Sequence, residues 1–112
     1  MTPRPVPEGS PLSLDRIIHG PLRLGIVAAL ASAERRTFTE LRDALGATDG
    51  NLNASLQKLE QAGYVAAARK MEGRTTFTEY QLTRAGQKAL AVYLAQLEGI
   101  VAPARKRLAD LD

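Results

Sequence analysis

Apolar side chains recur every three or four residues over most of the chain, in five segments: 12–19, 21–31, 40–45, 49–62 and 84–111. This spacing aligns them along one face of a helix, which can then be buried. Residues typical of helix ends separate the segments, because Gly-Pro divides the first two and a glycine follows the third and the fourth. The chain is therefore expected to be mainly helical.

Polar residues just before these segments predict where each helix begins. Ser13, Thr48 and Thr83 each stand where a side-chain oxygen can accept a hydrogen bond from a backbone N–H of the first turn. Two caps compete for the third helix: Thr39 directly before it, or Thr37 paired with Glu40 in a capping box. We favour Thr39, which leaves the two residues before it as a short extended segment.

Two segments depart from the helical pattern. Residues 65–69 and 75–82 contain the β-branched and aromatic residues that strands favour, and they flank residues 70–74, whose glycine fits a hairpin loop. Strand alternation places Tyr80 and Leu82 on one face, where they are expected to contribute to the core. The sequence thus predicts one small β-hairpin between the fourth and the last helix.

The two ends of the chain differ from its centre. Residues 1–11 hold four prolines and are expected to form a flexible arm, residues 12–98 one domain, and residues 99–112 a C-terminal helical extension. Pro103 cannot donate a hydrogen bond to the carbonyl of Gly99, so a kink or break is expected between these two residues.

Composition excludes several classes of protein. With no Cys the chain has no disulfide or thiolate site, and no apolar run approaches the roughly 20 residues of a membrane span. No secretory signal is visible, so a soluble cytoplasmic protein without a membrane partner is expected. No activated nucleophile, phosphate-binding glycine loop or metal-ligand spacing is present. We therefore expect no enzymatic activity and no cofactor.

The helices and hairpin follow one another in a familiar order, and five segments carry a resemblance to a known family. They are Pro21-Leu22-Arg23-Leu24-Gly25-Ile26, Phe38-Thr39-Glu40-Leu41, Asp49-Gly50-Asn51-Leu52, Leu56-Gln57-Lys58-Leu59-Glu60-Gln61-Ala62-Gly63-Tyr64-Val65 and Tyr80-Gln81-Leu82-Thr83-Arg84-Ala85-Gly86. In this order they resemble the winged helix-turn-helix repressors, in particular the ArsR/MarR-like branch, over about residues 12–98.

The resemblance implies an α+β winged helix-turn-helix with terminal dimerisation helices. It also implies a homodimeric transcriptional regulator, a repressor, in which the helix at 49–62 enters the major groove of double-stranded DNA and the wing at 69–76 contacts the backbone. Metal sensing is not expected, because His19 is the single histidine and there is no Cys. No further domain for a large ligand is expected in so short a chain, and a small-molecule effector is allowed but not indicated.

Residue chemistry identifies the surface that would contact DNA. If the leucines of helix 49–62 face the core, its other side presents amides and a lysine that can bond base edges, with small residues that permit close approach. Basic and hydroxyl side chains of the wing can bind phosphates. The candidates are Thr48, Gly50, Asn51, Asn53, Ala54, Gln57, Lys58, Arg69, Lys70, Arg74, Thr75 and Thr76. The alternative is a polar face that is merely solvated.

Apolar residues at both ends exceed the evident needs of one small core, and they predict a dimer interface. The candidates are Leu14, Ile17, Ile18, Leu90, Leu94, Leu97 and Val101. A monomer in which the terminal segments pack on one another is the alternative. For function, the competing hypothesis is a winged-helix module that binds protein, because helix 49–62 carries one lysine and has Asp49 and Glu60 nearby.

Overall fold

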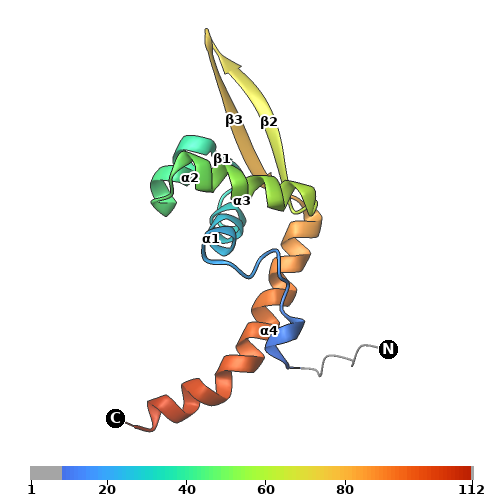
Figure 1. The fold of residues 1–112 in the computed structure, drawn as a ribbon, viewed down its shortest axis with the longest axis vertical. Coiled ribbons are helices and arrows are strands. Elements are labelled where there is room, and N and C mark those ends of the chain that lie inside the picture. The colour runs from blue at the N-terminus through green and yellow to red at the C-terminus, as the bar shows by residue number, and fades with distance from the viewer. Residues whose placement is uncertain (1–8, 112) are drawn as a thin grey trace.

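The computed structural model describes residues 9–111. Its elements follow the expected order, with a first short strand before the second helix (Figure 1). They are the 3-10 helix η1 (Pro11–Ser13), α1 (Pro21–Ala31), β1 (Arg36–Thr37), α2 (Phe38–Leu45), α3 (Asp49–Gln61), β2 (Val65–Glu72), β3 (Thr75–Leu82) and α4 (Arg84–Ala109).

The core lies between the three short helices, the base of the sheet and the first half of α4. Helix α1 is central, because it contacts α2, α3, α4 and β3. The periodic apolar residues of the sequence supply this core: Ile26, Val27 and Leu30 from α1, Leu41 from α2, Leu52, Leu56 and Leu59 from α3, and Val65, Tyr80 and Leu82 from the sheet. The predicted inward positions of Tyr80 and Leu82 are confirmed.

A three-stranded antiparallel sheet of order β1-β3-β2 carries the wing. The two long strands pair without interruption from Val65 opposite Leu82 to Glu72 opposite Thr75. Only two residues turn the chain, and Gly73 adopts a left-handed φ of 61° that suits a tight hairpin. The five-residue loop expected at 70–74 is therefore wrong. The paired hairpin projects beyond the helices (Figure 1).

Helix ends follow the local signals with one exception. Thr48 and Thr83 cap α3 and α4 as expected, and Gly63 ends α3 in a Schellman motif, with Tyr64 N–H donating to the Leu59 carbonyl at 2.9 Å. The prediction that Thr39 caps α2 is wrong.

Thr37 caps α2 because β1 ends there. Its hydroxyl accepts from the Glu40 N–H at 3.1 Å, and the Glu40 carboxylate accepts from the Thr37 N–H at 2.9 Å, which completes a capping box. Pairing of Thr37 with Glu79 of β3 holds the extended backbone that a cap requires. These hydrogen bonds also lower the pKa of Glu40.

Removal of this cap gives a direct test of the two alternatives. We expect Thr37→Ala to lower the free energy of unfolding by about 1 kcal/mol, because it leaves an N–H of the first turn of α2 without its side-chain acceptor. Chemical denaturation measures the change. Thr39→Ala, in the first turn but outside the cap, is the control and should leave stability nearly unchanged; a larger loss for Thr39→Ala would contradict this assignment.

The segment before α1 differs from the expected helix at 12–19. After η1, which Ser10 rather than Ser13 caps, the chain turns irregularly because Asp15 competes for its backbone. One Asp15 oxygen accepts from the N–H groups of Ile17 and Ile18 at 2.8 and 3.1 Å, and the other accepts from the Tyr64 hydroxyl. Of the proposed arm at 1–11, residues 1–8 lie outside the described residues.

Helix α4 is one element from Arg84 to Ala109, so of the kink or break expected between Gly99 and Pro103 the break does not occur. Figure 1 shows its ribbon unbroken, with a change of direction in its C-terminal part. An uninterrupted helix that loses a single hydrogen bond at a proline can bend without ending. The expected boundary at residue 99 therefore falls inside a helix rather than at an end of one.

The terminal segments pack on one another inside a single subunit. Leu14, Ile18 and Leu90 are buried in the core, and Tyr93, which the sequence pattern passed over, is 1% exposed. The expectation that the first three form a dimer interface is wrong, because the subunit itself already covers them. Leu94, at 51% exposure, points away from this contact, while Ile17 and Leu97 pack partly against the core and Val101 is half-buried.

Candidate nucleic-acid interface

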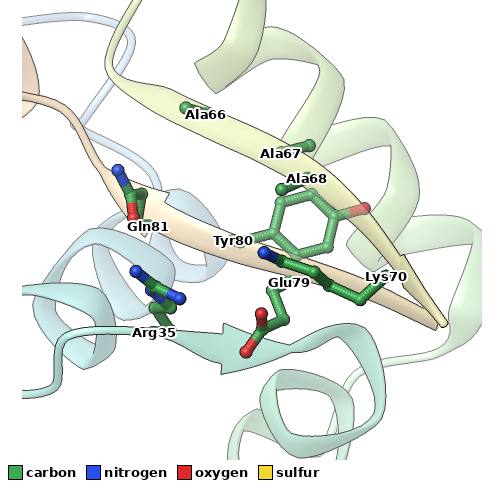
Figure 2. A pocket seen from close by; sticks show the side chains of 8 residues that line it. All are labelled: Arg35, Ala66, Ala67, Ala68, Lys70, Glu79, Tyr80 and Gln81. Atoms are coloured by element: carbon green, nitrogen blue, oxygen red, sulfur yellow. The ribbon is translucent and has the colours of Figure 1, made fainter. Parts of the chain in front are cut away.

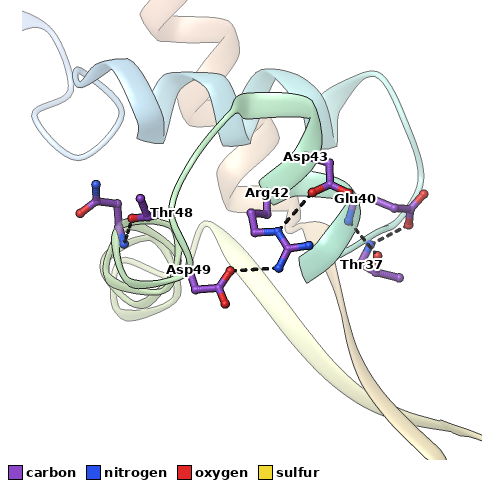
Figure 3. A network of polar contacts seen from close by, with 7 residues as sticks. Thr37, Glu40, Arg42, Asp43, Thr48 and Asp49 are labelled. Carbon is purple, nitrogen blue, oxygen red and sulfur yellow. Dashed lines mark hydrogen bonds and ion pairs between the residues drawn. The ribbon is translucent and has the colours of Figure 1, made fainter.

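Polar contacts fix the angle between α2 and α3. Gly46 ends α2 with a left-handed φ of 63°, and Thr48 begins α3 by accepting from the Asn51 N–H at 3.1 Å. Arg42 of α2 reaches Asp49 of α3 at 3.1 Å and also contacts Asp43 at 3.2 Å (Figure 3). The first of these hydrogen bonds is the largest cause of the raised pKa of Arg42. Asp49 is thus bound to the neighbouring helix.

The outward face of α3 is exposed. Leu52, Leu56 and Leu59 are fully buried, and every DNA-contact candidate on the helix is exposed. Residues at spacings of four and three share one stripe of a helix. Farthest from the core, that stripe carries Gly50, Ala54, Gln57 and Gln61. Gln61 was missed among the candidates, although the same spacing extended by one turn identifies it.

The two edges of this stripe face different surroundings. Glu60 lies near the sheet, since its charge, after burial, is a cause of the raised pKa of Tyr80 in β3. Asn53 is seven residues earlier and therefore shares that edge. On the opposite edge Asn51 lines a hollow with the start of α1, and Lys58 lines another with Arg16 and Arg23. Lys58 is thus separated from the cations of the wing.

The wing presents its candidates on both faces of the hairpin. Its candidate residues 69, 70, 74, 75 and 76 are all exposed. Strand alternation puts Arg69 and Thr76 on the face that bears Tyr80, and Lys70 and Thr75 on the other. Arg74 lies in the turn at the tip. The structure therefore brings the three cations together along one hairpin while dividing them between its two sides.

A small hollow lies on the outer face of the sheet. Arg35, Lys70, Glu79 and Gln81 gather there beside the alanines of β2, around a space of about 150 Å³ (Figure 2). Pockets for drug-sized ligands usually measure about 300 to 1,000 Å³. This hollow is thus smaller than a typical ligand pocket, and Glu79 brings a negative charge to the same side of the sheet as Lys70.

Neither a metal site nor a membrane span is found in the part of the chain that the structure describes. Within residues 9–111 no three His, Cys, Asp or Glu side chains come close enough to hold a metal ion. No helix of this range is both long and apolar enough to cross a bilayer.

Known proteins share this arrangement. The family model of the winged helix DNA-binding domain matches residues 22–101. An uncharacterized protein of Methanocaldococcus jannaschii is 30% identical over 82 residues, which cover 73% of this chain and 89% of that protein. These matches and the element order confirm the winged helix-turn-helix predicted from the sequence.

Two solved structures have a similar fold. A transcriptional regulator homologue from Pyrococcus horikoshii OT3 superposes with a TM-score of 0.76 at 26% identity, over 80% of this chain and 89% of that one. The transcriptional repressor BigR from Xylella fastidiosa superposes with a TM-score of 0.58 at 26% identity, over 71% of this chain and 76% of that one. Both are transcriptional regulators or homologues of one by their descriptions.

Proposed function

The chain belongs to the winged helix DNA-binding domain family, and from this premise we propose that it regulates transcription as a homodimer with α3 in the major groove and the wing on the backbone. The observation that carries the proposal is the uncovered stripe of α3 beside a projecting basic hairpin. Because α3 is already buried along its leucine face, the free side is available to a partner without rearrangement of the core.

The chemistry of the stripe suits base edges. A major groove about 12 Å wide admits a helix, and a side-chain amide can bond both N6 and N7 of adenine. Gly50 and Ala54 add little bulk at the start of the stripe, so the helix can lie close to the bases. Gln57 and Gln61 then extend from the same face, and Asn53 from its edge toward the wing.

The wing suits phosphates. Arg69, Lys70 and Arg74 form no ion pair with an acid of residues 9–111, so each retains its charge for a partner. Such cations can bind phosphates and so position the protein on the duplex without reading its sequence. Together with Lys58 this makes four cations per subunit, and eight per dimer.

Titration with random duplex DNA at increasing salt tests the proposal. Eight phosphate contacts release counterions, so log affinity should fall against log salt with a slope of about −7 or steeper. Fluorescence anisotropy of a labelled duplex measures it. Absence of binding at low salt would overturn DNA recognition and favour the protein-binding module, because phosphate attraction acts on any sequence.

The homodimer is proposed from the far end of α4. From residue 102 on, every described side chain of this helix is exposed, and Leu108 and Leu111 are 64% and 67% exposed. An isolated helix shorter than about 12 residues is marginal in water. A second copy that pairs with the exposed Leu94, Leu108 and Leu111 and with the half-buried Val101 would stabilise this end and set the distance between two α3 helices.

The mass of the protein in solution tests the proposed homodimer. We expect twice the 12.1 kDa chain mass by sedimentation equilibrium, and we expect Leu94→Glu/Leu108→Glu to reduce it to one chain, because charges would replace the apolar contact. Met71→Glu, which places a charge at an exposed apolar residue of the wing, is the control. A monomeric parent protein, or a dimeric Leu94→Glu/Leu108→Glu variant, would overturn the proposed interface.

We propose that the protein represses transcription rather than activating it. This proposal is supported by the similarity to a protein described as a transcriptional repressor. A dimer bound over a promoter would block access of the polymerase to it. Transcription in vitro from a promoter that contains a selected binding site should decrease on addition of the protein.

A further inference from the structure

A second basic surface flanks α3 on the side opposite the wing. It surrounds a shallow hollow of about 430 Å³, lined by Arg16, Ile17, Arg23, Lys58, Gln61 and Ala62. Three of these six side chains are cationic, and none is acidic. In Figure 1 the wing and the segment that precedes α1 lie on opposite sides of α3. We call Arg16, Arg23 and Lys58 the inner basic cluster.

The cations of this cluster are not neutralised within the subunit. Four ion pairs occur among residues 9–111, formed by Arg35, Arg42 and Arg105, and none includes a member of the inner basic cluster. Arg16 and Lys58 are exposed. Three like charges therefore share one hollow without a compensating carboxylate, an arrangement that favours an anionic partner.

Arg23 is held in place by the backbone. Its Nε donates to the Ile17 carbonyl at 2.6 Å, and its Nη2 lies 3.5 Å from the Arg16 carbonyl. These contacts orient the guanidinium while leaving its charge without an acidic partner. A fixed cation loses less conformational freedom on binding than a mobile one does. Arg23 thus anchors the cluster, and Arg16 and Lys58 lie beside it.

We propose that the inner basic cluster binds the phosphates of the DNA strand that borders the major groove opposite the wing. The proposal rests on the proposed function, because it places α3 in that groove. A major groove is bounded by two backbones, and a helix in it has one on each side. The wing reaches one flank of α3, and the cluster occupies the other.

Two consequences follow for the roles of residues. Lys58 binds phosphate rather than a base, since it lines the hollow with the two arginines and lies off the outward stripe. Selectivity then belongs to Gln57, Gln61 and Asn53, which are uncharged. Arg16 and Arg23 join the DNA-contact residues, although both precede the helix-turn-helix in sequence. Arg16 belongs to the irregular segment whose backbone Asp15 binds, and Arg23 belongs to the first turn of α1.

The salt dependence of the full chain tests the cluster. Arg16→Ala/Lys58→Ala removes two cations per subunit and four per dimer, so the slope of log affinity against log salt should become less steep by about 4. Binding to random duplex should weaken roughly eightfold per lost contact at 0.1 M salt. Arg23 is left intact because it also supports its own segment. Unchanged thermal unfolding of the variant shows that the fold persists.

Lys106→Ala/Arg107→Ala is the matched control, because it removes the same charge from the far end of α4. It should keep the slope of the parent protein. If the parent and the control bind DNA while Arg16→Ala/Lys58→Ala shows the same slope as they do, the cluster is overturned and DNA binding stands. If the parent protein binds no duplex at low salt, the proposed function itself fails.

Ethylation interference locates the contacts on a selected binding site. Modified phosphates on the flank of the major groove opposite the wing should stop interfering in Arg16→Ala/Lys58→Ala, while those on the flank that the wing contacts should still interfere. Interference on both flanks in this variant, as in the parent protein, would contradict the assignment even if affinity decreased.

Discussion

Replacement of Arg69, Lys70 and Arg74 together by Ala is expected to weaken binding to random duplex DNA at least a thousandfold at 0.1 M salt. Six phosphate contacts of the dimer disappear, and at roughly eightfold per contact at 0.1 M salt their combined loss is on the order of 10⁵. The slope of log affinity against log salt should become less steep by about 5. Anisotropy titration at several salt concentrations measures both quantities.

The folded state should not respond to this change. All three side chains are exposed and form no ion pair within residues 9–111. The free energy of unfolding should therefore stay within about 0.5 kcal/mol of that of the parent protein. Arg105→Ala/Lys106→Ala/Arg107→Ala has the same net charge and is the control. Equal losses of affinity in both triple variants would show that overall charge, rather than the wing, attracts DNA.

Substitution of Gly86 is expected to have the largest effect on stability. A Cβ atom there would lie 2.2 Å from the carbonyl oxygen of Tyr64 and 2.7 Å from Cδ1 of Leu82, and no real Cβ approaches a backbone atom so closely. The Tyr64 carbonyl cannot withdraw freely, because it also accepts from the Thr83 N–H at 2.9 Å. The start of α4 would have to move away from the end of α3.

We expect Gly86→Ala to lower the free energy of unfolding by about 3 kcal/mol and the melting temperature by roughly 12 °C or more. Chemical and thermal denaturation measure the two changes. Gly99→Ala is the matched control in the same helix: a Cβ there meets nothing within 4 Å, and alanine is the better helix former. A Gly86→Ala protein as stable as the Gly99→Ala protein would show that this contact relaxes without cost.

Local patterns in the sequence determined most of the elements and their ends. The 3.6-residue period predicted α1, α2, α3 and α4 because one face of each helix must be buried. Caps at Thr48 and Thr83, and the turn after Gly63, follow from hydrogen bonds between residues at most five positions apart. The resemblance to winged-helix regulators rested on the order of these same segments.

Contacts between distant residues decided what the pattern left open. Thr37 rather than Thr39 caps α2 because Thr37 pairs with Glu79, which is more than forty positions away in β3. The segment at 12–19 is irregular because Asp15 bonds both its own backbone and Tyr64. Apolar spacing alone does not distinguish these outcomes, since it records which face is buried and not which partner buries it.

The candidate interface divides in the same way. Exposure of the outward α3 face was predictable. Once the leucines of a helix face the core, the residues on its opposite side must face away from the core. Only the tertiary structure placed Lys58 with Arg16 and Arg23, on the side away from the wing, and buried Leu14, Ile18 and Leu90 within one subunit. A sequence records the period of each helix, whereas the rotation of one helix against its neighbours depends on how their side chains pack together.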